Sequence, residues 1–117
     1  IVQWIILKIT ILITNIMTKQ GQTDDYKVSD FVKTLEKYLG SQLDVVIANT
    51  QKPKASELAR YKKEKAKVVT QDLKKKVIAE PLLSDGKFKK SKSDKLKRSF
   101  LRHDPDKLAK IIYELLA

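Results

Sequence analysis

Side chains that can hold a polar ligand gather in two loops, each directly after a run of branched apolar residues. The first loop offers an amide, two hydroxyls, a carboxylate and a glycine, at Asn15, Thr18, Thr23, Asp24 and Gly21. The second loop begins with Asn49, after the run Leu-Asp-Val-Val-Ile-Ala. Parallel sheets bind ligands beyond the carboxyl ends of their strands, so this placement predicts hydrogen bonds to a ligand. The alternative is that these side chains only stabilise their own turns.

Three consecutive polar residues, Arg102, His103 and Asp104, precede a predicted helix near the end of the chain. Arginine binds a diphosphate through paired hydrogen bonds, and the start of the neighbouring helix also favours an anion. A surface ion pair is the alternative for this arginine. His103 is a second candidate contact for a ligand, although a lone histidine beside a helix start is more often structural. Asp104 is expected to cap the helix.

Several kinds of chemistry lack the residues they need. The chain has no cysteine and one histidine, which excludes thiolate metal sites and argues against a histidine-rich metal centre. No Ser-His-Asp set is indicated, and no catalytic residue is assigned. Asp24 and Asp25 are able to hold Mg²⁺ beside a diphosphate through water, although adjacent acids in an exposed loop are usually only solvated.

The net charge of +11 is confined to the middle of the chain, where residues 52–102 carry 18 basic and six acidic residues. Only three of the 25 basic residues are arginines, and reading of nucleic acids relies on the guanidinium group. A solvated lysine surface is therefore the favoured interpretation, with no nucleic-acid or membrane partner. A basic module that binds nucleic acid or a membrane surface is the alternative.

The hydrophobic pattern predicts alternating strands and helices. Apolar residues at three- and four-residue spacing predict helices over 28–39 and 105–116, with another expected over 56–65. Ser29 or Asp30 is expected to cap the first helix and Gly40 to end it. Short apolar runs predict strands within 1–17 and at 43–48, 68–69 and 77–79, and an exposed loop is expected over 84–98.

Residues 1–17 are predicted to contain the central strand of a parallel sheet, because branched apolar residues dominate the run. The run is shorter than the roughly 20 residues of a membrane helix and contains Lys8. It also lacks the charged start and small-residue end of a signal peptide. The order of elements therefore predicts an α/β fold with a mainly parallel sheet and flanking helices.

Three motifs in the same order resemble the gluconeogenesis-factor family, also called YvcK-like and related to the CofD phospholactate transferases. The first is Asn15-Ile16-Met17-Thr18, followed by Gly21, Thr23-Asp24, Tyr26 and the helix start Ser29-Asp30-Phe31-Val32. The second is the strand that ends at Asn49, and the third is Arg102-His103-Asp104. Tyr61 and Asp72 also fall where this family tends to place Tyr and Asp.

The resemblance implies a cytoplasmic protein of Rossmann-like fold that binds nucleotide sugars of the UDP class, without an established reaction. It also implies a role in cell shape and the cell wall during gluconeogenic growth. The family's glycine-rich loop has no counterpart here, so residues 1–117 are expected to be the C-terminal part of an incomplete domain. A CofD-like transferase is the alternative. The implied ligand contacts are Asn15, Thr18, Gly21, Thr23, Asp24, Asn49, Arg102 and His103.

Overall fold

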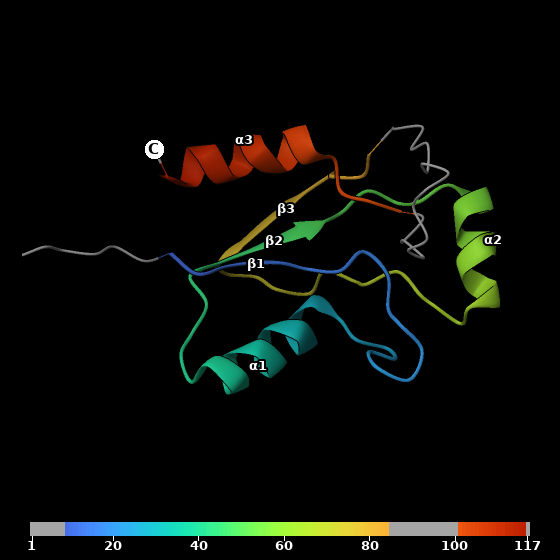
Figure 1. Ribbon diagram of the computed structural model, residues 1–117, viewed down its shortest axis with the longest axis horizontal. Coiled ribbons are helices and arrows are strands. Elements are labelled where there is room, and N and C mark those ends of the chain that lie inside the picture. Colours follow the sequence, from blue (N-terminus) through green and yellow to red (C-terminus); the bar gives the residue numbers. More distant parts are fainter. Residues whose placement is uncertain (1–8, 85–100, 117) are drawn as a thin grey trace, which may run out of the picture.

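The fold is built on a three-stranded parallel sheet (Figure 1). A computed structural model describes residues 9–84 and 101–116. Its strands are β1 (Ile11–Ile13), β2 (Val45–Asn49) and β3 (Val77–Glu80), in the order β1-β2-β3. Ile13 pairs with Ile47, and Ile47 pairs with Ile78, so the three strands are in register at one level of the sheet. The α/β prediction with a parallel sheet is confirmed.

Helices cover both faces of this sheet, with α1 (Val28–Leu39) on one side and α3 (Pro105–Leu116) on the other (Figure 1). Alternate residues of β2 pack into the two cores on opposite faces of the sheet. Val46 and Ala48 belong to the core beneath α1, whereas Ile47 belongs to the core beneath α3. This double burial explains why β2 is apolar at nearly every position instead of alternating with polar residues.

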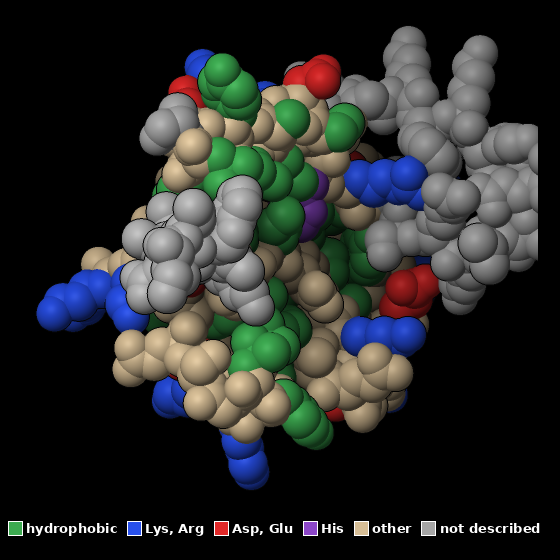
Figure 2. Space-filling model, turned by 60° about the vertical axis from the view of Figure 1, so that its left-hand side comes forward, with side chains coloured by type: hydrophobic (Ala, Val, Ile, Leu, Met, Phe, Trp, Pro, Cys, Tyr) green, Lys and Arg blue, Asp and Glu red, His purple; other side chains and the backbone are tan. Residues whose placement is uncertain are grey.

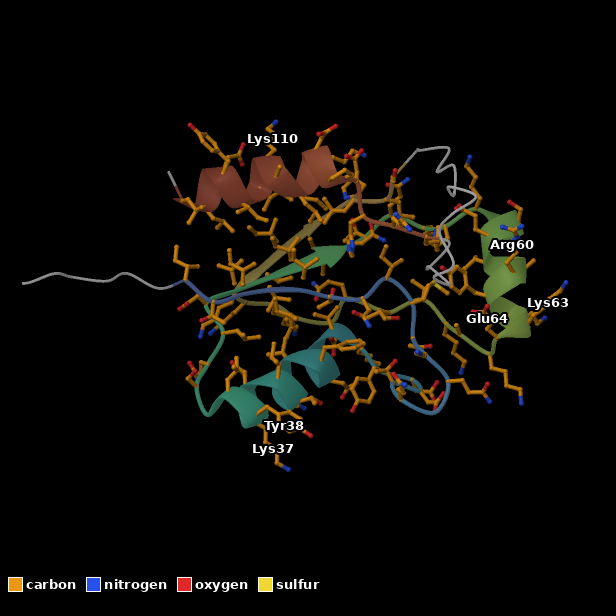
Figure 3. The ribbon with its side chains drawn as sticks, viewed as in Figure 1. Lys37, Tyr38, Arg60, Lys63, Glu64 and Lys110 are labelled. Atoms are coloured by element: carbon orange, nitrogen blue, oxygen red, sulfur yellow. The ribbon has the colours of Figure 1, made fainter. Side chains whose placement is uncertain are left out.

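The outer faces of the two covering helices are polar. Lys37 and Tyr38 on α1, and Lys110 on α3, point away from the sheet (Figure 3). The inner face of α3 is an apolar stripe that runs through Leu108, Ile111 and Leu115, as its spacing predicts.

Each covering helix has a recognisable start or end. Gly40 ends α1 in the left-handed conformation, with φ of 71°, and its N–H donates to the Glu36 carbonyl at 2.9 Å, as predicted. The capping prediction for α1 is wrong, because the N-cap position is Lys27 and not Ser29 or Asp30. The Asp30 carboxylate instead reaches back and accepts the Lys27 N–H at 2.8 Å.

The capping prediction for the last helix is confirmed. The Asp104 carboxylate accepts hydrogen bonds from the N–H groups of Asp106 at 2.9 Å and Lys107 at 3.3 Å. These are two of the four donors that a helix start leaves without a partner within the helix. Asp104 therefore fixes where α3 begins, directly after His103.

The start of α1 is attached to the segment before β3 by Asp72. The Asp72 carboxylate accepts the Ser29 hydroxyl at 2.6 Å and the Ser29 N–H at 2.9 Å. The hydroxyl contact, together with the backbone contacts and the nearby Lys27 charge, holds the pKa of Asp72 below its usual value. The ionised carboxylate is thus the form that stabilises the fold.

We expect Asp72→Asn to lower the free energy of unfolding by about 0.5 kcal/mol at pH 7, a small value because the carboxylate is exposed. The folded-state pKa lies below the unfolded one, so the contribution is complete above about pH 3.9 and is lost as the pH falls through the folded value. Urea titrations of both forms at pH 7 and pH 2.5 check this, because the difference should become smaller in acid. Ser29→Ala should reproduce much of the loss, and a difference independent of pH would contradict the prediction.

Two other predictions need correction. The first apolar run was expected to supply the central strand, but among the described residues β1 pairs only with β2 and lies at an edge. Burial on both faces makes a strand apolar whether it has one neighbour or two, so the pattern cannot separate centre from edge. Val68 and Val69 form no strand of the sheet; Val68 makes an isolated bridge with Met17.

The helix predicted over 56–65 is confirmed as α2 (Ala55–Lys63). It covers neither face of the sheet and lies beyond the end of β2 (Figure 1). Tyr61 is its one buried residue, and four of its other eight residues are charged. The loop predicted over 84–98 lies outside the described residues after Ser84. In the part of the chain described here, no helix is long and apolar enough to cross a membrane.

Candidate functional site

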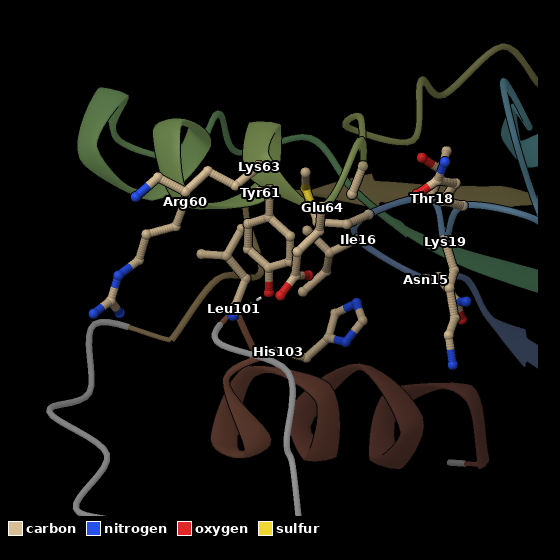
Figure 4. Close-up of a pocket in the computed structure, with 13 residues that line it drawn as sticks. Asn15, Ile16, Thr18, Lys19, Arg60, Tyr61, Lys63, Glu64, Leu101 and His103 are labelled. Carbon is tan, nitrogen blue, oxygen red and sulfur yellow. Dashed lines mark hydrogen bonds between the residues drawn. The ribbon is translucent and has the colours of Figure 1, made fainter.

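An open cleft lies beyond the carboxyl end of β1, with a volume of about 1170 Å³ (Figure 4). Three segments form its walls. They are residues 15–20 after β1, the second half of α2 with Ala66, and residues 101 and 103 before α3. The cleft therefore opens at the edge of the sheet where the sequence predicted a ligand.

A small apolar cluster of Ile16, Tyr61, Leu83 and Leu101 lies at the cleft, and all of its members except Leu83 line it. The Tyr61 hydroxyl accepts a hydrogen bond from the Leu101 N–H at 2.9 Å (Figure 4). This bond attaches the segment that carries His103 to α2. Tyr61, which the family resemblance had singled out, is therefore a positioning residue in this structure.

The segment after β1 is held by the chain that follows α2. The Thr18 N–H donates to the Lys67 carbonyl at 2.7 Å, and the Lys67 N–H donates to the Thr18 hydroxyl at 2.8 Å. The Val69 N–H donates to the Ile16 carbonyl at 2.9 Å. Thr18 is buried and also lines the cleft. Its hydroxyl accepts the Lys67 N–H and so stabilises the fold.

Three predicted contacts belong to the turn that follows Thr18. The Thr23 hydroxyl accepts the Lys19 N–H at 2.7 Å, and the Asp24 carboxylate accepts the Gly21 N–H at 2.9 Å. Gly21 takes a φ of 81°, which suits a residue without a side chain. Gly21, Thr23 and Asp24 are not among the residues that line the cleft. Their contacts are those of the alternative interpretation, in which the side chains stabilise their own turn.

The acidic pair at this turn is poorly placed to hold Mg²⁺. Asp24 bonds to Gly21, and the Asp25 carboxylate forms an ion pair with the Lys67 ammonium at 2.8 Å. The hydrogen bond and charge of Lys67 lower the pKa of Asp25. Within residues 9–84 and 101–116, no group of three His, Cys, Asp or Glu residues is arranged to hold a metal.

Asn49 connects the end of β2 to the chain after β3. Its amide donates to the Gln51 carbonyl at 2.9 Å, and its oxygen accepts the N–H groups of Gln51 at 3.1 Å and Leu82 at 2.9 Å. Asn49 is not among the residues lining the cleft. The structure thus gives this predicted contact residue a role in the fold.

The third predicted motif is divided between the cleft and its surroundings. His103 lines the cleft, as does the exposed side chain of Asn15. Burial lowers the pKa of His103. Its Nε2 atom is buried without a hydrogen-bond partner among the described residues. Arg102 is half-buried and is not a lining residue; its carbonyl accepts the Ser84 N–H at 2.8 Å. A contact between its side chain and a ligand stays a prediction.

Four charged lining residues were not predicted. Lys19 follows β1, Arg60 and Lys63 extend from α2, and Glu64 lies at the C-cap position directly after it (Figures 3 and 4). Lys63 and Glu64 follow Arg60 at three- and four-residue spacing, which places the three residues on one side at the end of the helix. That spacing was a signal in the sequence, but its use required knowing that α2 lies beyond the sheet and not on its face.

The remaining basic side chains form no single patch on the face that Figure 2 shows. Lysine and arginine side chains stand apart around its periphery, separated by neutral and acidic groups. A phosphate backbone is bound by basic groups gathered on one surface. The described residues on this face therefore show no such basic surface.

Comparison with known proteins relates the chain to one family. A family model described as "2-phospho-L-lactate transferase CofD" matches residues 7–83. A protein of Thermotoga maritima named "Putative gluconeogenesis factor" is 39% identical over 111 residues, which is 87% of this chain and 32% of the relative. A protein of the same name from Aquifex aeolicus is 31% identical over 113 residues, which is 91% of this chain and 31% of the relative.

A solved structure agrees with the fold. The crystal structure of a UPF0052 family protein from Bacillus halodurans superposes with a TM-score of 0.73 at 24% sequence identity. The match covers 90% of this chain and 32% of that one. The chain thus spans about a third of the length of the relatives it matches. Since the family model matches more than half of its residues, the chain belongs to the CofD family.

Proposed function

We propose that this chain forms part of a binding site for a nucleotide sugar of the UDP class, in a protein that regulates and does not catalyse. The observation that carries the proposal is the composition of the cleft beyond the sheet. Exposed cations line it at Lys19, Arg60 and Lys63, beside the Glu64 carboxylate, and neutral polar side chains line it at Asn15, which is exposed, and at His103, which is half-buried. Cations suit a diphosphate, and neutral donors and acceptors suit sugar hydroxyls.

The names of the relatives support a role in gluconeogenesis. In this proposal the protein acts in the cytoplasm and links the supply of nucleotide sugars to cell shape and the cell wall during gluconeogenic growth. Ligand binding in place of turnover fits the cleft, because the described residues around it include no nucleophile paired with a base.

Calorimetric titration with UDP-glucose and UDP-N-acetylglucosamine tests the proposal. Lys19→Ala should weaken the binding of a UDP-sugar about threefold to fivefold, as expected for one exposed charge contact. Lys37→Ala removes the same charge from the outer face of α1 and should leave the affinity unchanged (Figure 3). Equal effects of the two variants, or no binding of either UDP-sugar, would contradict the proposal.

Arg102→Ala tests the contact predicted from the sequence. A bidentate arginine contact to the diphosphate should make its loss cost about tenfold in affinity or more, against a threefold to fivefold loss for Lys19→Ala. An unchanged affinity would remove Arg102 from the site, in keeping with its position outside the cleft lining.

A second candidate is a transferase, which the description of the matching family favours. In that case the cleft would hold a nucleotide-activated phospholactyl donor next to an acceptor. Incubation with such a donor, followed by chromatography of the products, separates the two functions. Binding without any product supports the regulator, and release of the free nucleotide supports the transferase.

A further inference from the structure

Among the described residues, Nε2 of His103 is the buried side-chain polar atom that has no hydrogen-bond partner. Buried polar atoms in folded proteins almost always have a hydrogen-bond partner, because an unpaired one costs about 1–3 kcal/mol. Nε2 is buried and has no partner among the described residues, although the ring lines a cleft of polar side chains. An atom of this kind in an open cleft is suited to a group that arrives with a ligand.

The surroundings of His103 indicate which kind of ligand group would bind Nε2. The imidazole ring extends into the space between Glu64, which directly follows α2, and the segment that carries Asn15 and Lys19 (Figure 4). Burial lowers the pKa of the imidazole, so the ring is neutral at pH 7 and carries no charge for a phosphate. A neutral imidazole nitrogen donates or accepts one hydrogen bond, and a hydroxyl group matches either state.

Three side chains at the rim of the cleft supply the positive charge that the neutral His103 ring lacks. Arg60 and Lys63 extend from the far side of α2, away from the imidazole, and Lys19 extends along the opposite wall (Figure 4). All three are exposed. The cations and the neutral ring therefore occupy different parts of the cleft, which fits a ligand with an anionic part and a hydroxyl-bearing ring.

We propose that Nε2 of His103 hydrogen-bonds a sugar hydroxyl of the bound ligand and thereby distinguishes a sugar-bearing ligand from a bare diphosphate. The inference rests on the proposed function, because it assigns one contact within that site. The hydroxyl belongs to either the ribose or the attached hexose, and the two sources share the same chemistry at Nε2.

The test compares wild type with His103→Leu and His103→Gln. Titration with UDP-glucose, UDP and inorganic pyrophosphate separates the parts of the ligand. His103→Leu should lower the affinity for UDP-glucose about tenfold and leave the affinity for pyrophosphate unchanged, because the substitution removes the hydrogen bond but no charge. His103→Gln, whose amide can replace Nε2, should recover part of the loss. A loss with UDP as well as UDP-glucose assigns the contact to the ribose, and a loss with UDP-glucose alone assigns it to the hexose.

A stability measurement separates ligand binding from a structural role. His103→Leu removes a buried polar atom without a partner, so the free energy of unfolding without ligand should stay the same or rise. A lower stability would mean that the imidazole serves the fold, and would overturn the inference. Equal affinity of wild type and His103→Leu for UDP-glucose would also overturn the inference. So would a loss of affinity for pyrophosphate as large as the loss for UDP-glucose. If wild type binds neither UDP-glucose nor UDP, the proposed function fails and this inference fails with it.

Discussion

Substitution of Ile47 by alanine is expected to lower the free energy of unfolding by about 2–5 kcal/mol. Ile47 has no exposed surface and lies at the middle of the central strand. Its side chain packs with Leu82 and Ile111, so truncation leaves a cavity between the sheet and α3. Small domains are stable by only about 5–15 kcal/mol, so this one change removes a large share of the total.

Chemical unfolding followed by far-ultraviolet circular dichroism measures the effect. Leu116→Ala provides the matched control, since Leu116 is an aliphatic residue of the same fold that is 66% exposed. Its truncation should change the free energy of unfolding by no more than about 0.5 kcal/mol. Similar losses in the two variants would show that the core between β2 and α3 is not where the structure puts it.

Replacement of Asn49 by leucine is expected to cost about 2–4 kcal/mol, because it leaves the N–H groups of Gln51 and Leu82 without their acceptor. The size of the effect comes from the buried position of Leu82, which has no exposed surface. The same change should weaken any ligand bound near His103, since the Asp104 N–H bonds to the Leu82 carbonyl and ties His103 to this chain segment.

Asn15→Leu is the control for Asn49→Leu. Asn15 is exposed on the cleft and its side chain makes no hydrogen bond among those recorded for the described residues. The change should leave the free energy of unfolding within about 0.5 kcal/mol of wild type. If Asn49→Leu is as stable as Asn15→Leu, the Asn49 side chain is not needed for the fold. That result would support the sequence-based prediction that Asn49 contacts a ligand.

Local patterns were sufficient to predict most elements of the fold. The apolar spacing of α1 and α3, the glycine at position 40 and the carboxylate at position 104 each act within a few residues, so they can be read along the chain. The position of β1 within the sheet could not be read this way, because strand order depends on contacts between distant segments. The location of α2 depends on Tyr61 and Leu101, which are distant in sequence.

The cleft lies at the edge of the sheet where the sequence predicted a ligand, but most of the residues that line it were not among the predicted contacts. Polar residues after a strand are equally suited to bind a ligand or to close a turn, and the choice depends on nearby N–H groups. The side chains of Thr23, Asp24 and Asn49 accept hydrogen bonds from backbone N–H groups. Nε2 of His103 has no partner among the described residues. Sequence spacing does not reveal that difference, because it arises from the final positions of neighbouring chain segments.

The bonds that assemble the cleft also decide when in folding it can exist. Thr18 and Lys67 are 49 positions apart, and Tyr61 and Leu101 are 40 apart. Such contacts require long loops to close, whereas α1 needs only its own residues and its neighbours in the sheet. We therefore expect the cleft to form late, after α1 has docked. During synthesis, a chain that is still held by the ribosome at residue 101 has already made β1, β2 and β3 but lacks the wall of the cleft that carries Leu101 and His103.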